Sequence, residues 1–559
     1  MARVVRALIA AVLGAAALPG GAIVINAVPA SAVGSVGVSS MIQAGTCATG
    51  STYCFAPSTV AIPVGAIVQW TNTTPVAHTA SDDGATWTTG LVNPGQTTMV
   101  TFNTAGTFTY HCMIHPDMHG TILVGTGYAA TASPQQYSLQ GSDGSSWAQM
   151  DSSHLAISVT PAVGSTAIIS GNADLWTAAA GYNQDLGIDV NGSTIAWKES
   201  GGFAGTFSPN AAFVQTMQSL SAGMTYAIDL RWKTNKPAAG ATIFAGAGPI
   251  PPGSTSYSPT RLTVRWVPAS ATNPVGAARN LQYSLSNSDG ATWMDLDPNT
   301  PTNNPTISFT APSSGTAILS ANADLWTATA GYNQDLGINV NGGIVGWKES
   351  GGFAGTFSPN AAFVQVAFPM VAGSYTIKLQ WKTNKPAVGA TIYAAAGAAF
   401  PYSDTSVSLR FVPSGIGITD AASTNQYSLT GTASDGVTWQ TLDVARLAFT
   451  IPSVATNCVA IIGGNADLWT ANAGYNQDLA ITVDGTVASW KESGGFAGTF
   501  SPNAAFVQAF VPLSAGSPHD VSLQWKANKP AQSATIFAAA GPAGAHSETE
   551  LTAEVISCS

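Results

Sequence analysis

A threefold internal repeat constrains the fold of this 559-residue chain more than any other sequence feature. The segment NADLWT begins at Asn172, Asn322 and Asn465, and each copy continues through AGYNQDL and WKESGGFAGTFSPNAAFVQ to a late W-K-x-N-K-P segment. Solenoid repeats are roughly 20–45 residues long, and these units are far longer. Each copy is therefore expected to be a domain of its own.

Apolar and polar residues alternate in short stretches of every copy, such as TAIISGNADLW and TYAIDLRWK, with Gly, Asn, Pro and Ser between them. This alternation predicts strands joined by turns. The sequence thus predicts an all-β protein with three repeated β-sandwich or jelly-roll-like domains at 135–268, 281–413 and 425–559. The pattern loosely resembles C1q-like jelly rolls, but no motif that carries chemistry assigns the repeats to a family.

The segments between the units are rich in Ala, Gly, Thr and Pro at 125–134, 268–280 and 413–424. Such segments are typical of linkers. The sequence therefore predicts modules arranged like beads on a string.

The middle block of each copy is nearly identical, while the flanks diverge. One interpretation is a binding face presented three times, with Trp and Tyr stacking on sugar rings. A second interpretation, which we prefer, is that the block forms the core and turns of a duplicated sandwich, with loop polar groups satisfied by residues such as Asp174 and Asp185. A calcium site at these two loops is a third alternative.

A different kind of motif lies before the repeats, in the stretch FTYHCMIHPDMHG at 108–120. It contains Cys112, His115 and Met118, and His78 lies upstream after the strand-like run AIVQWTN. Copper that cycles between two oxidation states favours two imidazoles and one thiolate in a plane, with a weak thioether. These four residues are therefore predicted to be metal ligands, whereas His111 and His119 are expected to point elsewhere, into solvent.

The segment from about residue 36 to 125 resembles plastocyanin and its cupredoxin relatives. The resemblance is carried by the strand from Gly65 to Asn72, the lone His78, the strand from Gly106 to Cys112, and the C-x-x-H-x-x-M-x-G pattern. It implies a Greek-key β-sandwich with one type 1 copper ion held by His78, Cys112, His115 and Met118. It also implies one-electron transfer to a redox partner protein, with the exposed edge of His115 as the electron exit.

The first 32 residues are predicted to be a signal peptide, with Arg3 and Arg6, an apolar run and a small-residue cleavage site at 30–32. The alternative is an uncleaved membrane anchor, and no later segment is predicted to span a membrane. We therefore expect a secreted or cell-surface protein. Of the five cysteines, four remain if Cys112 binds copper, and of three pairings we favour Cys47–Cys54 and Cys458–Cys558 because each lies within one domain.

The net charge of −10 and the absence of clustered Lys and Arg argue against nucleic acid as a partner. Seven histidines without paired H-x-H motifs argue against an oxygen-reducing multicopper oxidase, so we expect no enzyme. Two functions remain. The first is an exported blue copper electron carrier, and the second is an adhesion protein whose repeats bind polysaccharide or cell-wall material.

Overall fold

The computed structural model describes residues 37–44, 52–56, 59–62, 66–102, 106–124, 127–161, 164–201, 209–249, 256–268, 274–311, 314–351, 359–413, 418–431, 434–453, 458–494, 502–531 and 533–558. Regular structure in these residues consists of strands and one short 3₁₀ helix, which confirms the all-β class. Within these ranges, no helix has the length and apolar character needed to cross a membrane. The predicted signal peptide lies outside the described residues.

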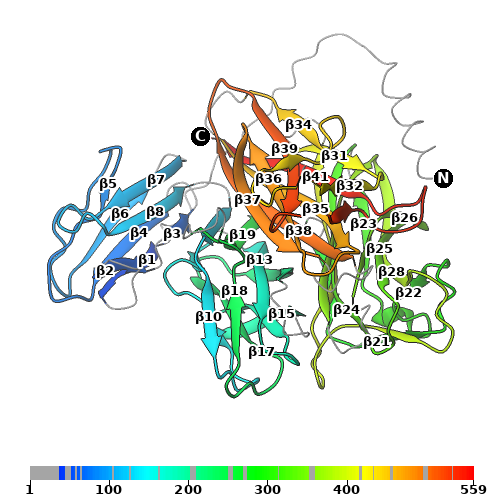
Figure 1. Ribbon diagram of the computed structural model, residues 1–559. Coiled ribbons are helices and arrows are strands. Elements are labelled where there is room, and N and C mark those ends of the chain that lie inside the picture. Colours follow the sequence, from blue (N-terminus) through cyan, green and yellow to red (C-terminus); the bar gives the residue numbers. More distant parts are fainter. Residues whose placement is uncertain are drawn as a thin grey trace, which may run out of the picture.

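The N-terminal domain is a sandwich of two sheets (Figure 1, blue). Its strands are β1 (Gly37–Ala44), β2 (Tyr53–Ala56), β3 (Thr59–Ile62), β4 (Ala66–Asn72), β5 (Ser81–Asp82), β6 (Thr97–Phe102), β7 (Gly106–His111) and β8 (His119–Val124). One sheet has the order β2-β1-β4-β6, and the other includes β3-β8-β7-β5. Alternate residues of both sheets, among them Trp70 and Tyr110, point inward and form one buried core.

The three repeats have the same two-sheet topology. The first contains β9 (Tyr128–Ser133), β10 (Tyr137–Gln140), β11 (Ala148–Gln149), β12 (Ala156–Val159), β13 (Ser165–Thr177), β14 (Gln184–Val190), β15 (Ser193–Ser200), β16 (Asn210–Leu220), β17 (Tyr226–Thr234), β18 (Thr242–Ala245) and β19 (Thr260–Pro268). The second contains β20 (Val275–Arg279), β21 (Tyr283–Ser286), β22 (Met294–Asp295), η1 (Pro301–Asn303), β23 (Thr306–Ala311), β24 (Gly315–Thr327), β25 (Gln334–Val340), β26 (Gly343–Ser350), β27 (Asn360–Met370), β28 (Gly373–Thr383), β29 (Thr391–Ala394) and β30 (Thr405–Pro413). The third contains β31 (Ile418–Ser423), β32 (Tyr427–Thr430), β33 (Gln440–Thr441), β34 (Ala448–Ile451), β35 (Cys458–Thr470), β36 (Gln477–Val483), β37 (Thr486–Ser493), β38 (Asn503–Leu513), β39 (His519–Ala527), β40 (Thr535–Ala538) and β41 (Thr549–Cys558).

In each repeat, one sheet is built around the long strand β13, β24 or β35, and the other around β14, β25 or β36. A separate hydrophobic core fills each sandwich. The prediction of three repeated β-sandwich domains is therefore confirmed.

The repeats pack around a common centre, where each contributes one phenylalanine. Phe213, Phe363 and Phe506 occupy equivalent positions on β16, β27 and β38 and are almost fully buried. Their ring centroids lie 4.2, 4.5 and 4.5 Å apart. Because each ring contacts both others, the three repeats form a closed, threefold arrangement.

The nearly identical block supplies the polar contacts between neighbouring repeats. A backbone N–H in the WKES segment of one repeat donates to the NADLWT aspartate of the next, and the bond recurs at all three interfaces: Glu199 to Asp324 at 3.1 Å, Glu349 to Asp467 at 3.0 Å and Glu492 to Asp174 at 3.1 Å. The lysine of each WKES segment also reaches a backbone oxygen of the next repeat: Lys198 to Asp404, Lys348 to Glu548 and Lys491 to Pro259. The third repeat thus closes onto the first.

These contacts give the repeated block a role that the sequence analysis did not anticipate. Polar residues of its described part, such as Asp174, Lys198 and Glu199, are buried and bond across the interfaces instead of forming an exposed face. The carboxylate of Asp185 is paired with Lys233 of its own repeat, so an ammonium group lies where the calcium alternative would place an ion. Similarity among the copies is explained by the need for three matching interfaces.

The N-terminal domain is joined to the first repeat by backbone pairing. Strand β3 lies parallel to β12, with Val60 opposite Ser158 and Ala61 opposite Val159. This pairing creates one sheet with the order β15-β14-β17-β12-β3-β8-β7-β5. The prediction of independent beads was therefore wrong, because sheet edges and repeat faces that could have met solvent are used for contacts between domains.

The cysteine pairings are only partly visible. Cys458 lies opposite Cys558 in the register of β35 and β41, as the predicted second pair requires. Cys54 lies on β2, and its predicted partner Cys47 is outside the described residues. Both pairings stay predictions.

Replacing Phe363 with Ala should destabilise the repeat assembly. The variant removes a buried ring from the centre of three domains, which costs about 3–5 kcal/mol of unfolding free energy. Val388→Ala is the control, because that side chain is 87% exposed and should change the stability by less than about 0.5 kcal/mol. Denaturant unfolding measures both variants. Equal stability of the two would show that the repeats do not depend on their common centre.

Candidate metal centre

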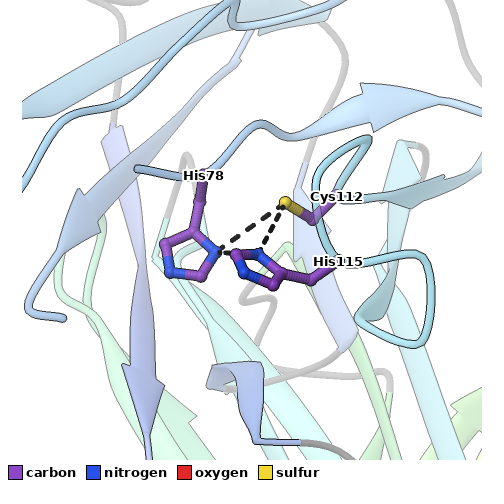
Figure 2. Close-up of side chains that lie close together, drawn as sticks. All are labelled: His78, Cys112 and His115. Atoms are coloured by element: carbon purple, nitrogen blue, oxygen red, sulfur yellow. Dashed lines mark hydrogen bonds between the residues drawn. The ribbon is translucent and has the colours of Figure 1, made fainter. Parts of the chain in front are cut away.

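Three of the four predicted ligands converge at one end of the N-terminal domain (Figure 2). The donor atoms of His78, Cys112 and His115 all lie within 4.8 Å of one another. The Cys112 Sγ lies 3.7 Å from His78 Nδ1 and 3.6 Å from His115 Nδ1, and the two nitrogens are 3.1 Å apart. Residues far apart in the sequence thus present one sulfur and two nitrogens to a common point.

A tight loop between β7 and β8 positions two of these residues. The N–H of Cys112 donates to the carbonyl of Met118 at 3.0 Å, and the N–H of Met118 donates to the carbonyl of His115 at 3.0 Å. The loop therefore closes on itself directly after the strand. Gly120 follows because a Cβ there would lie 2.3 Å from the Tyr110 ring, which fills the core beneath the loop.

His78 is held by a hydrogen-bonded chain that starts at the end of β4. The backbone of His78 pairs with Val92 in both directions, and its ring is fully buried. The hydroxyl of Thr74 donates to Asn72 Oδ1 at 2.8 Å and lies 2.8 Å from His78 Nε2. Since the hydroxyl proton goes to Asn72, Nε2 carries the imidazole proton and donates it to Thr74. The lone pair of Nδ1 then faces Cys112, as a metal ligand requires.

Cys112 is a free, buried cysteine, and its sulfur accepts a hydrogen bond from the N–H of Thr79 at 3.3 Å. Thr79 is held in turn, because its hydroxyl oxygen accepts the N–H of Met113 at 2.8 Å. The segment after His78 thus supports the cysteine as well.

The ligands differ in their access to solvent. His78 and Cys112 are fully buried, whereas His115 is half-buried. The ring of Tyr53 lies 4.8 Å from both imidazole rings and covers them from the side of β2. The cluster therefore reaches solvent through the imidazole ring of His115.

Met118, the predicted fourth ligand, follows His115 in the same loop and stays a prediction as a ligand. It is 1% exposed and belongs to the same core cluster as Cys112. His119 is exposed, and His111 is partly exposed and bonded to Asp83 at 2.6 Å, so both histidines lie outside the cluster of His78, Cys112 and His115.

The donor set suits copper better than a hard cation. One sulfur and two imidazole nitrogens in a plane at about 2.0–2.3 Å from an ion are separated by about 3.5–3.8 Å. The two sulfur–nitrogen separations fall in this range, and the nitrogen pair lies slightly closer. Calcium and magnesium prefer oxygen ligands, and the cluster offers none.

Asn72, Thr74 and Thr79 were not predicted as part of the site. The stretch NTTPVAHT carries a signal for them, because Asn and Thr next to a proline form local hydrogen-bonded turns. What the pattern could not reveal is that the turn would direct a hydroxyl at the histidine nitrogen.

The chain matches no protein-family model and no curated protein sequence. Among solved structures, it is similar to a purple cupredoxin from Nitrosopumilus maritimus, with 28% identity over 16% of this chain and 98% of that chain and a TM-score of 0.14. It is also similar to amicyanin from Paracoccus versutus, with 26% identity over 17% of this chain and 85% of that chain and a TM-score of 0.14. A Cu(I) form of an amicyanin variant shows 26% identity over 12% of this chain and 69% of that chain, with a TM-score of 0.12. At these scores, the argument for the site rests on its own geometry.

The pKa of His78 should distinguish it from other histidines. Burial, followed by the nearby His115, lowers the pKa of His78 to about 4, while the hydrogen bond to Asp151 raises the pKa of His154. An exposed imidazole titrates near 6.5, so the unfolded chain takes up the proton first as the pH falls. The contribution of neutral His78 to the free energy of unfolding is therefore present in full above about pH 6.5, and it is lost as the pH falls toward 4. Hydrogen–deuterium exchange at the imidazole C2, measured by mass spectrometry on the metal-free protein, should give a pKa below 6.5 for His78 and a pKa above 6.5 for His154. A value for His78 at or above 6.5 would contradict the buried environment.

Replacing Thr74 with Val should weaken metal binding without removing a ligand. Valine has the same shape but cannot accept the Nε2 proton, and loss of such a supporting bond typically lowers metal affinity by about 10–100-fold. Thr71→Val is the matched control, because the Thr71 hydroxyl bonds to Thr97 at an exposed position. Copper titration of both variants measures the effect. Equal affinities would show that Thr74 does not orient His78.

Proposed function

We propose that this protein is an exported blue copper protein that transfers single electrons. The observation that carries the proposal is the convergence of the Cys112 sulfur with the nitrogens of His78 and His115. Copper held there would supply a one-electron couple, and Met118 would be the weak fourth ligand. Export is inferred from the predicted signal peptide.

The surroundings of the site support electron transfer over substrate chemistry. Tyr53 covers the imidazole rings, and the other ligands lie in the core, so little space is left for a substrate at the ligand atoms. The hydrogen bond that His78 Nε2 donates to Thr74 and the one that the Thr79 N–H donates to the sulfur hold both ligands in place before any metal binds. A site held in this way needs little rearrangement when the charge of its ion changes.

His115 is the proposed route of the electron. It is the one residue of the three that reaches solvent, and the residues before it in the loop, Met113 and Ile114, are 67% and 47% exposed. A partner protein could therefore approach the imidazole edge over an apolar surface.

Adhesion through the repeats remains a second prediction, but it has less support now that the repeats are seen to pack against one another. The identical block was its proposed binding face, and this block is used between the repeats. Retention of the repeats on polysaccharide or cell-wall material would support it, and no retention across a broad panel would remove it.

The colour of the copper-loaded protein tests the proposed site. A thiolate bound to Cu(II) gives an intense visible charge-transfer band, so Cys112→Ser should abolish the band that the unmodified protein shows. His119→Gln is the matched control, because this exposed histidine lies in the same loop region and should leave the band unchanged. Absorption spectroscopy after stoichiometric loading gives the answer. A colourless unmodified protein, or a band that survives in Cys112→Ser, would overturn the proposal.

A further inference from the structure

A polar cavity lies where the three repeats meet. Its volume is about 80 Å³, and equivalent positions of all three repeats line it. A single water needs roughly 10–15 Å³ by this measure, so the cavity is large enough for a small ion together with a few waters. A sugar or a nucleotide is too large for it.

The charges in this cavity do not balance. Arg265 on β19, Arg410 on β30 and Glu554 on β41 occupy equivalent positions, opposite Ile168, Ile318 and Ile461 in the strand register. Both guanidinium groups contact the same oxygen of the Glu554 carboxylate. Among the described residues no other charged side chain lines the cavity, so two positive groups face one negative group.

The excess positive charge is shielded from water. The side chains of Arg410, Glu554 and Arg265 are 10%, 13% and 21% exposed. Burial lowers the pKa of Arg410 to about 10, and although Glu554 raises it, the like charge of Arg265 lowers it further. Buried charges in proteins are normally paired, and each guanidinium has five N–H donors of which one carboxylate can accept only a part.

The rest of the lining favours an acceptor as the occupant. The side-chain oxygens of three glutamines each accept a hydroxyl from a neighbouring repeat: Gln215 from Ser408, Gln365 from Thr552 and Gln508 from Thr263. With its oxygen bonded in this way, the Gln215 amide donates to Ser170 at 3.3 Å, and each glutamine amide can act towards an occupant only as a donor. The glutamine amides therefore add N–H donors to the lining beside the arginines.

We propose that this cavity binds one small inorganic anion, of the size of a halide or a tetrahedral oxyanion, between Arg265 and Arg410. The ion neutralises the second guanidinium, which Glu554 alone leaves unbalanced. Because Arg265 and Arg410 come from different repeats, the bound anion stabilises the threefold assembly. A cation is repelled by the net positive charge of the same groups.

Bromide is the probe that locates the site directly. Crystals of the full chain grown in sodium bromide should show an anomalous peak in contact with both guanidinium groups. Peaks confined to the outer surface would overturn the proposal.

Thermal unfolding in solution provides the independent test. The melting temperature of the full chain should rise saturably with sodium bromide, compared with sodium gluconate at the same sodium concentration, because gluconate does not fit the cavity. Arg265→Gln should abolish the difference, whereas Arg446→Gln, at a side chain 57% exposed, should preserve it. An equal difference in Arg265→Gln and the unmodified protein would overturn the proposal.

A third variant covers the case in which Arg265→Gln does not fold. Glu554→Gln removes the built-in negative charge, so bromide should reach half of its effect at a concentration at least about tenfold lower. If bromide reached half of its effect at the same or a higher concentration in Glu554→Gln, the result would contradict the proposed site.

Discussion

The hydrogen bond between His78 and Thr74 is the constraint on which the metal centre depends. A fully buried imidazole stays neutral, and each of its nitrogens needs a partner. Thr74 takes the proton on one nitrogen, which leaves the other as an acceptor next to the Cys112 sulfur. The site is thereby prepared for a positive ion by residues that do not bind it.

The same strands connect this centre to the rest of the molecule. Strand β8 begins in the ligand loop and pairs with β3, and β3 pairs with β12 of the first repeat. The first repeat then packs on the other two around Phe213, Phe363 and Phe506. The proposed metal centre is therefore joined by sheet pairing to a closed assembly of three sandwiches. We infer that the repeats hold the proposed redox site in a defined orientation.

Much of the fold and of the site could be predicted from the sequence, for identifiable reasons. Alternation of apolar residues predicted the strands, and the spacing of Cys112, His115 and Met118 predicted a single loop. That spacing works because a short loop with its own hydrogen bonds has few conformations. His78 was predictable from its residue type and from the strand that precedes it.

The contacts between domains were not predictable from the same patterns. The alternation of apolar residues in a strand is the same whether a side chain packs inside its own sandwich or against another repeat. The role of Phe213 at the common centre therefore could not be predicted. The repeated block that contains Lys198 was expected to form the core and turns of one sandwich, or a binding face, although Lys198 is buried against a neighbouring repeat. The partners of Thr74 and Arg265 also depend on three-dimensional register. Such pairings arise only when distant strands meet.

A crystal structure of the copper-loaded chain, compared with the metal-free chain, tests the central claim most directly. The account predicts one ion per chain in the N-terminal domain, bound by the Cys112 sulfur and by Nδ1 of His78 and His115, with these side chains and Thr74 nearly unmoved. Copper bound elsewhere, through Nε2 of His78, or only after the ligand loop rearranges would contradict it.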